Sequence, residues 1–260
     1  MSEEQLSIES IRDALETKYV GRPTLYYPSV TSTMDVARKA VAGGASEGTV
    51  ILADEQTAGR GRLGREWVSP PDSSLMLSII LYPKLEQLPR LTLVACLAIA
   101  RSIEEVALLE TSIKWPNDIQ IGGRKVSGVL LESKVNGEKV SYAIVGLAIN
   151  VNLDTRAIPE IAYIATSLKN EMGVPVSRLE MLAALLSEFE KVYKDMRDGE
   201  PVELEWKRRL NTLGKNVTVR CGDVVHKGIA EDVDKDGNLL LRLPNKRLEV
   251  ISAGDVTLKV

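Results

Sequence analysis

Residues 128–151 read GVLLESKVNGEKVSYAIVGLAINV. Two largely apolar runs, residues 128–135 and 139–151, flank the pair Asn136-Gly137. An Asn-Gly pair between two such runs is typical of a tight hairpin turn, because both residues accept the positive φ angles that the turn requires. The stretch therefore predicts two long strands that pair antiparallel.

The segments before and after this hairpin predict further strands and several helices. Apolar runs predict strands at residues 49–53, 75–82, 112–115 and 119–121. Apolar residues at helical spacing predict helices at residues 7–18, around 34–41, at 91–109, from Ser177 onward and at 202–213. This mixture predicts an α+β fold, with a mixed, mostly antiparallel sheet and helices on one side.

The last part of the chain has a different character. From residue 215 onward the helical periodicity stops, and short alternating segments are separated by Asp236-Gly237, Pro244-Asn245 and Gly254. That pattern is typical of a small barrel of short strands. We therefore expect two domains, one over residues 1–213 and a small all-β barrel over residues 214–260.

The composition excludes several classes of protein. The 260 residues carry 33 basic and 36 acidic side chains, and this net charge of −3 argues against a global electrostatic grip on nucleic acid or anionic lipid. One histidine, His226, excludes a histidine-rich zinc site and argues against a Ser-His-Asp triad. The apolar runs are shorter than the roughly 20 residues that span a bilayer. Two distant cysteines and the acidic residues 1–4, which lack the apolar core of a signal peptide, predict a cytoplasmic protein.

The most informative motif is residues 54–67, DEQTAGRGRLGREW. Its glycines fit G-x-G-x-x-G after a strand, but the dinucleotide fingerprint also requires a helix to begin there. Pro70-Pro71 follow instead, so we reject that interpretation, and no kinase motifs accompany the glycines. Glycines that expose backbone N–H groups, together with three arginines, suit a loop that closes over an anion. A solvated basic loop fits the composition equally well.

A second polar cluster follows in residues 114–118, KWPND, and continues to Lys125. Lys125 precedes an apolar strand, where a lysine either seeks an anionic partner or protects a sheet edge. Asn117 and Asp118 fit either a turn or a pair of polar ligands. Asn150 and Asn152 are unusual because they end a long apolar strand, where amides need a partner.

Together these motifs resemble those of the biotin protein ligase family, from about residue 20 to the C-terminus. The matching segments are, in order, Ser32-Thr33, Gln56, residues 59–67, residues 114–118, Lys125-x-x-Gly128-x-Leu130-x-Glu132 and Gly146-x-x-Ile149-Asn150-Val151-Asn152. The resemblance implies a core like that of class II aminoacyl-tRNA synthetases and an SH3-like C-terminal barrel. It implies that biotin reacts with Mg²⁺-ATP to give biotinyl-5′-AMP, and that biotin then passes to a lysine of a biotin carboxyl carrier protein.

The resemblance also implies roles for particular residues. The catalytic residues would be Lys125, Arg60 and Arg62. Biotin would contact Ser32, Thr33, Met34, Gln56, Gly59, Arg60, Gly61, Arg62, Lys125 and Gly128. The nucleotide would contact Arg60, Arg62, Arg65, Trp67, Asn117, Lys125 and Asn150, although Trp67 fits a core position equally well. Asp118 would either hold the metal or position Lys125.

Some family members carry an N-terminal DNA-binding domain of about sixty residues, whereas only about twenty residues precede the matching region here. We therefore expect the monofunctional class, with no nucleic acid or membrane partner, no structural metal, and a monomer or a homodimer. A lipoate ligase is a related alternative, but that family lacks the motif of residues 59–67. A nucleic-acid-binding module would need more aromatic residues than the 4% present. A biotin-binding protein without catalytic activity remains a further alternative.

Overall fold

The computed structural model describes residues 6–67 and 69–258. The acidic residues 1–4 and the end of the expected barrel, residues 259–260, lie outside this part of the chain. Among the described residues, none of the helices combines the length with the apolar character that a membrane-spanning segment needs.

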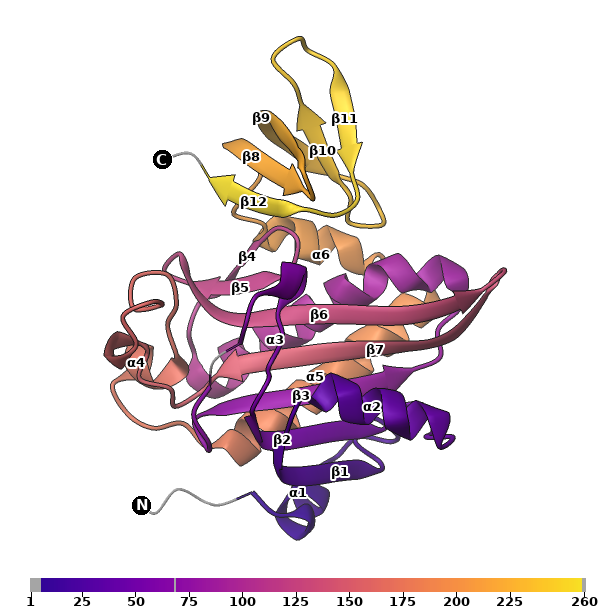
Figure 1. Ribbon diagram of the computed structural model, residues 1–260, viewed down its shortest axis with the longest axis vertical. Coiled ribbons are helices and arrows are strands. Elements are labelled where there is room, and N and C mark those ends of the chain that lie inside the picture. Colours follow the sequence, from indigo (N-terminus) through magenta and orange to yellow (C-terminus); the bar gives the residue numbers. More distant parts are fainter. Residues whose placement is uncertain (1–5, 68, 259–260) are drawn as a thin grey trace.

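A seven-stranded sheet forms the main body, in the strand order β1-β2-β3-β7-β6-β5-β4 (Figure 1). The strands are β1 (Thr24–Val30), β2 (Val50–Gln56), β3 (Ser74–Leu81), β4 (Ser112–Lys114), β5 (Asp118–Ile121), β6 (Arg124–Asn136) and β7 (Lys139–Asn150). Strands β1 and β2 are parallel and all other neighbours are antiparallel, which confirms the mixed, mostly antiparallel sheet. The predicted hairpin is β6–β7, with Asn136 opposite Lys139.

Helices cover the two faces of this sheet unequally. The helices are α1 (Ile8–Ala14), α2 (Thr33–Ala42), α3 (Leu91–Ala107), α4 (Leu168–Met172), α5 (Arg178–Asp198) and α6 (Val202–Arg209). The long helices α3 and α5 share the main apolar core with one face of the sheet. Helix α2 lies on the other face, where Met34 and Ala37 pack with Ile51, Ile80 and Ile144. This position of α2 differs from the expected arrangement with helices on one side only, because its apolar stripe needs its own sheet surface.

The observed elements differ from the predicted ones where local signals are weak. Strand β1 was not predicted, and it lies at the sheet edge, the position that its internal Pro28 permits. Strand β2 extends to Gln56, three residues beyond the expected end, so that Asp54 and Gln56 lie on a strand rather than in a loop. The short helix α4 was also not predicted. The extension of β2 matters because it carries the first three residues of the motif at residues 54–67.

The C-terminal part forms a separate five-stranded antiparallel sheet, in the order β11-β10-β9-β8-β12. Its strands are β8 (Asn216–Cys221), β9 (Val224–Val233), β10 (Leu239–Arg242), β11 (Leu248–Ile251) and β12 (Asp255–Leu258). It sits at one end of the main body (Figure 1), where the Trp115 indole Nε1 donates to the Gly237 carbonyl at 2.9 Å. Strand β12, which we did not predict, begins at Asp255, whose carboxylate forms an ion pair with Arg65 of the main body.

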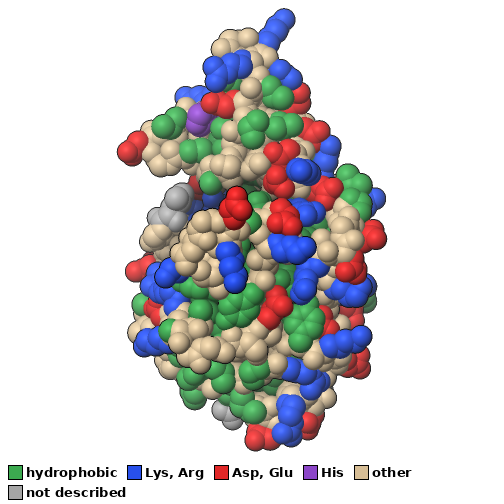
Figure 2. All heavy atoms as spheres, turned by 90° about the vertical axis from the view of Figure 1, so that its right-hand side faces the viewer, with side chains coloured by type: hydrophobic (Ala, Val, Ile, Leu, Met, Phe, Trp, Pro, Cys, Tyr) green, Lys and Arg blue, Asp and Glu red, His purple; other side chains and the backbone are tan. Residues whose placement is uncertain are grey.

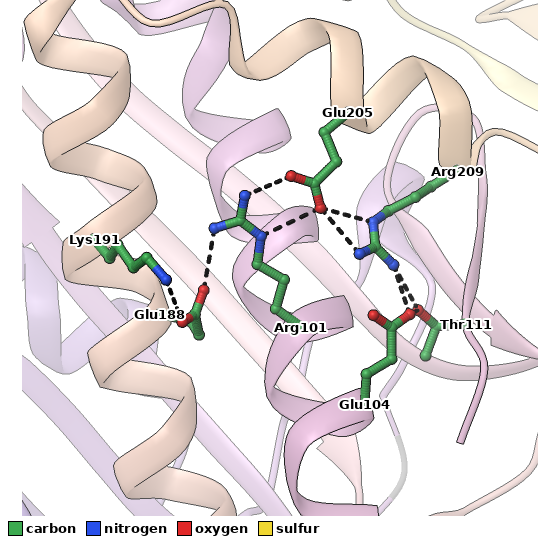
Figure 3. Close-up of polar contacts among 7 residues, drawn as sticks. All are labelled: Arg101, Glu104, Thr111, Glu188, Lys191, Glu205 and Arg209. Carbon is green, nitrogen blue, oxygen red and sulfur yellow. Dashed lines mark hydrogen bonds and ion pairs between the residues drawn. The ribbon is translucent and has the colours of Figure 1, made fainter. Parts of the chain in front are cut away.

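An ion-pair network joins α3, α5 and α6 (Figure 3). Arg101 of α3 contacts Glu188 of α5 at 3.1 Å and Glu205 of α6 at 2.5 Å. Arg209 of α6 contacts Glu104 at 2.5 Å and Glu205 at 2.9 Å. The network fixes α6, the element that leads into the C-terminal sheet.

On the face shown in Figure 2, acidic and basic side chains are interspersed, and neither sign of charge forms a separate patch.

Candidate active site

A cavity lies on the α2 face of the main sheet. Most of the predicted site residues line it: Ser32, Thr33, Met34, Gln56, Arg60, Gly61, Arg62, Arg65, Trp67, Asn117, Asp118, Lys125 and Gly128. These residues lie at the start of α2, at the end of β2 and in the segment that follows it, around the start of β5, and in β6. The fold thus brings four separate stretches of sequence to one place.

Two predicted residues, Gly59 and Asn150, do not line the cavity. Gly59 lies in the stem of the glycine-rich loop, where a Cβ would come within 2.6 Å of the Trp67 carbonyl oxygen. The Asn150 side chain is buried at the end of β7, and its Nδ2 donates to the Thr166 carbonyl at 3.0 Å. Its Oδ1 has no hydrogen-bond partner among the described residues.

The structure adds lining residues that the motifs did not assign: Glu66, Leu77, Val129, Leu130, Gly146, Leu147, Ala148 and Asp255. Gly146 and Ala148 belong to a quoted motif, and their small size on the cavity face of β7 was a usable signal. Asp255 had no sequence signal, because it lies on a different sheet and far along the chain.

The start of α2 forms a polar end of the cavity. Ser32 caps the helix by accepting a hydrogen bond from the Met34 backbone N–H at 3.3 Å. The Gln56 Oε1 accepts from the Thr33 backbone N–H at 2.8 Å and from its hydroxyl at 3.1 Å. The buried hydroxyl of Ser78 donates to Thr33 at 2.8 Å. These bonds hold amide and hydroxyl groups in fixed positions beside the cavity.

Two glycines keep the sheet surface under the cavity flat. A Cβ at Gly146 would lie 2.9 Å from the Met34 sulfur. A Cβ at Gly128 would lie 3.0 Å from the Cε and Nζ atoms of Lys125 and 3.5 Å from the Trp67 ring. Any side chain at either position would therefore displace a residue that lines the cavity.

Residues 57–73, which we call the arginine loop, connect β2 with β3 across the cavity. The Gly61 backbone N–H donates to the Arg65 carbonyl at 2.7 Å, and the Trp67 N–H donates to the Gly59 carbonyl at 3.0 Å. An isolated bridge pairs Arg60 with Glu66, and a 3₁₀ turn forms the tip at Arg62–Gly64. Residues 59–67 of the loop therefore form a compact hairpin with its own backbone hydrogen bonds.

Each arginine of the loop has a protein partner. Arg60 contacts Asp35 of α2 at 2.5 Å, and Arg65 forms an ion pair with Asp255 of β12. Arg62 donates to the Asn117 Oδ1 at 2.8 Å and to the Gly254 carbonyl at 3.1 Å. Burial lowers the pKa of the Arg62 guanidinium, although nearby acidic groups oppose that shift. Burial alone would raise the pKa of Asp35, but the hydrogen bond and charge of Arg60 outweigh it and hold that pKa below its usual value.

Lys125 lines the cavity. Its Nζ is 2.6 Å from the Asp118 Oδ1 and 5.5 Å from the centre of the Trp67 ring. Its backbone is fixed on both sides, because its N–H donates to the Ile164 carbonyl and its carbonyl accepts from Thr166. The buried Trp67 indole Nε1 has no hydrogen-bond partner within the described residues.

Asp118 was expected either to hold metal or to position Lys125. Its contact with Lys125 favours the positioning role. In the described part of the chain, no group of three or more His, Cys, Asp or Glu side chains could hold a metal ion. The cavity does combine four cationic side chains with buried amide and hydroxyl groups, which suits a substrate that carries both anionic and uncharged polar parts.

Comparisons with known proteins address the identity of such a site. Residues 26–150 match the model of the Biotin/lipoate A/B protein ligase family, and residues 212–259 match the Biotin protein ligase C terminal domain. The Bifunctional ligase/repressor BirA of Bacillus subtilis is 38% identical over 259 residues, which cover 98% of this chain and 79% of that protein. The chain belongs to the biotin protein ligase family.

Two further relatives are informative, one a named ligase and the other a solved complex with biotin and ATP. The biotin–[acetyl-CoA-carboxylase] ligase of Paracoccus denitrificans is 35% identical over 224 residues, covering 83% of this chain and 92% of that protein. The structure of the biotin protein ligase from Aquifex aeolicus in complex with biotin and ATP has a TM-score of 0.77 and 31% identity. It covers 91% of this chain and 98% of that one. The α+β architecture and the C-terminal β-sheet are thus those of a biotin protein ligase.

Proposed function

We propose that this protein activates biotin with Mg²⁺-ATP to form biotinyl-5′-AMP, and then transfers biotin to a lysine of a biotin carboxyl carrier domain. The observation that carries the proposal is the placement of Lys125 and three arginines around one cavity that is floored by glycine and closed by a loop. Membership of the family supports the same reaction.

The charge in the cavity suits the first half-reaction. A carboxylate oxygen of biotin attacks the α-phosphorus of ATP and forms a new P–O bond. The bond from the α-phosphorus to the oxygen that bridges to the β-phosphorus breaks, and pyrophosphate leaves. Both reactants are anions, so cations must offset their repulsion, and donors that are already in place stabilise the charge in the transition state. Lys125 would lie between the carboxylate and the α-phosphate, with Asp118 holding its ammonium group, while Arg60 and Arg62 complete the cationic wall.

The remaining predicted residues divide between the two ends of the cavity. For biotin we assign the polar end at α2 and the glycine floor, which are Ser32, Thr33, Met34, Gln56, Gly61 and Gly128, with Gly59 supporting the loop. For the nucleotide we assign Arg65, Trp67 and Asn117. Asn150 would act on the nucleotide side indirectly, through the segment that it bonds at Thr166.

Mg²⁺ would enter with the phosphates of ATP, as part of the substrate. We further propose that residues 1–213 form the catalytic domain and that residues 214–260 support it, since Asp255 and Gly254 contact the arginine loop. The acceptor would be the lysine of a biotin carboxyl carrier protein. A mixed anhydride hydrolyses when water reaches it, so a loop that covers the cavity would protect the intermediate until that lysine arrives.

The decisive experiment is exchange of labelled pyrophosphate into ATP, with biotin and lipoate as parallel substrates. We expect exchange with biotin alone. Exchange with lipoate alone would refute the proposal and favour a lipoate ligase. If neither substrate supports exchange but biotin binds in a titration, the protein is a biotin-binding protein without the activation step.

A further inference from the structure

A buried ion-pair cluster lies outside the cavity, at the base of the arginine loop. Arg178, the first residue of α5, donates from Nη1 to the Asp54 Oδ1 at 2.7 Å and from Nη2 to the Asp72 Oδ1 at 2.8 Å. The Arg178 and Asp54 side chains are 7% and 9% exposed, whereas that of Asp72 is 52% exposed. The hydroxyl of Tyr26 donates to the second oxygen of Asp54.

The two carboxylates lie on the two sides of the arginine loop, one before it and one near its end. Asp54 lies on β2, two residues before the strand ends at Gln56. Asp72 lies on the returning limb, two residues before β3 begins. One guanidinium therefore joins the strand that leads into the loop to the loop's returning limb, although Arg178 itself does not line the cavity.

The returning limb depends on this contact because its backbone is otherwise unfavourable. Asp72 has a φ of +60°, in the left-handed region that costs a non-glycine residue roughly 1 kcal/mol. The neighbouring Ser73 carbonyl accepts from the Asn152 backbone N–H at 2.7 Å. The Asn152 side chain in turn exchanges two hydrogen bonds of 2.9 Å with the Val176 backbone, just before Arg178. The start of α5 thus holds the limb at two points.

Burial makes the cluster specific to one geometry. A buried arginine is tolerated only with partners that satisfy its fixed fork of donors. Here Asp54 supplies a buried partner on the sheet, and Asp72 supplies a second partner on the loop. If the loop moves away, Arg178 loses its contact with Asp72, and its Nη2 must donate to water instead.

We infer that Arg178 is a positioning residue, which acts through Asp72 to keep the arginine loop closed over the cavity. The inference rests on the proposed function for its consequence, which is slow release of the adenylate. Its expected signature is a faster opening of the loop when the contact with Asp72 is removed, with the rest of the fold unchanged.

The test uses Asp72→Asn rather than a change of Arg178, because removing Arg178 would leave Asp54 buried without a partner and could unfold the protein. Asparagine tolerates the left-handed backbone, so the substitution removes the charge without adding strain. The matched control is Asp198→Asn. Asp198 lies on the same helix, is 54% exposed and pairs with Lys194 at 2.5 Å, far from the loop in sequence.

Two measurements follow on the intact protein. The first is limited proteolysis with trypsin without ligand, with peptide masses reporting cleavage after Arg60, Arg62 or Arg65. The second is the dissociation rate of biotinyl-AMP, measured by chase with unlabelled biotin and ATP. For Asp72→Asn we expect both rates to rise about three- to tenfold, the scale of one partly exposed charge-assisted hydrogen bond, at an unchanged melting temperature. For Asp198→Asn we expect wild-type rates.

The outcomes separate this inference from the proposed function. If the loop of Asp72→Asn resists trypsin as well as that of Asp198→Asn, the positioning role is refuted, whatever the protein catalyses. A lower melting temperature without faster cleavage in the loop would also refute it, because that result describes a purely structural contact. If wild-type protein forms no adenylate, the proposed function fails while the proteolysis result still decides the role of Arg178.

Discussion

At the scale of single residues, Lys125 carries the strongest prediction. Its ammonium group lies 2.6 Å from Asp118 and faces the cavity. Lys125→Ala should slow biotin-dependent pyrophosphate exchange by on the order of 10²–10³, the scale of losing one electrostatic stabiliser. Lys114→Ala is the control, because Lys114 belongs to the neighbouring motif but does not line the cavity. Equal exchange rates in the two variants would contradict the role given to Lys125.

Residue patterns predicted part of this site and missed part of it for identifiable reasons. The motifs placed Lys125 and the loop arginines, because cations and glycines at that spacing are distinctive. Asn152 was recognised only as unusual, and its role in holding residues 73 and 176 depends on contacts between segments far apart in sequence. Asp255 could not be predicted, because one acidic residue after a glycine has no distinctive local pattern.

At the scale of elements, the sequence predicted long periodic segments better than short ones. The β6–β7 hairpin and helices α3 and α5 formed near their predicted positions, because their apolar periodicity extends over many residues. Strand β1 was missed because Pro28 weakens its strand pattern, and the short strand β12 (Asp255–Leu258) was missed as well. The internal pairing of the arginine loop was also missed, because glycine and arginine carry no strand signal.

The ion-pair network of α3, α5 and α6 predicts how stability depends on pH. The hydrogen bond from Arg101, reinforced by Arg209, lowers the pKa of Glu205 to about 2. Because the pKa is lower in the folded state, this contribution to the free energy of unfolding is complete above the ordinary carboxyl pKa and is lost as pH falls toward 2. Glu205→Gln should cost about 1–2 kcal/mol near pH 6.

Urea denaturation between pH 6 and pH 3 tests this expectation. The difference in unfolding free energy between wild type and Glu205→Gln should shrink as the solution becomes more acidic. A constant difference across that range would show that Glu205 contributes by packing rather than by its charge.

At the scale of the whole molecule, the close packing between the C-terminal sheet and α3 predicts that adding one methyl group at Gly237 lowers the free energy of unfolding. Gly237 has a φ of +82°, and a Cβ there would come within 2.7 Å of Leu93 Cδ1 on α3. Gly237→Ala should therefore lower the free energy of unfolding by about 2–3 kcal/mol, from backbone strain and steric overlap together. Gly222→Ala is the control, because Gly222 has a φ of +58° but a Cβ there would meet no described atom within 4 Å.

Thermal denaturation of both variants measures the difference. The loss for Gly222→Ala should reflect strain alone, about 1 kcal/mol, so the excess for Gly237→Ala reports the contact between the C-terminal sheet and α3. Equal losses would mean that the junction yields easily and contributes little to stability.

The bridge that Arg178 makes between Asp54 and Asp72 has a consequence for how this enzyme family can vary. The two limbs behave as a chain whose ends are pinned, and the entropy of such a chain changes only slowly with its length, by about 0.6 kcal/mol for each doubling. Extra residues in the loop that leave Arg60, Arg62 and Arg65 in place should therefore cost little in closure entropy. The length of the loop between its pinned ends can therefore vary, whereas the three arginines and the pinned ends fix how the loop covers the cavity.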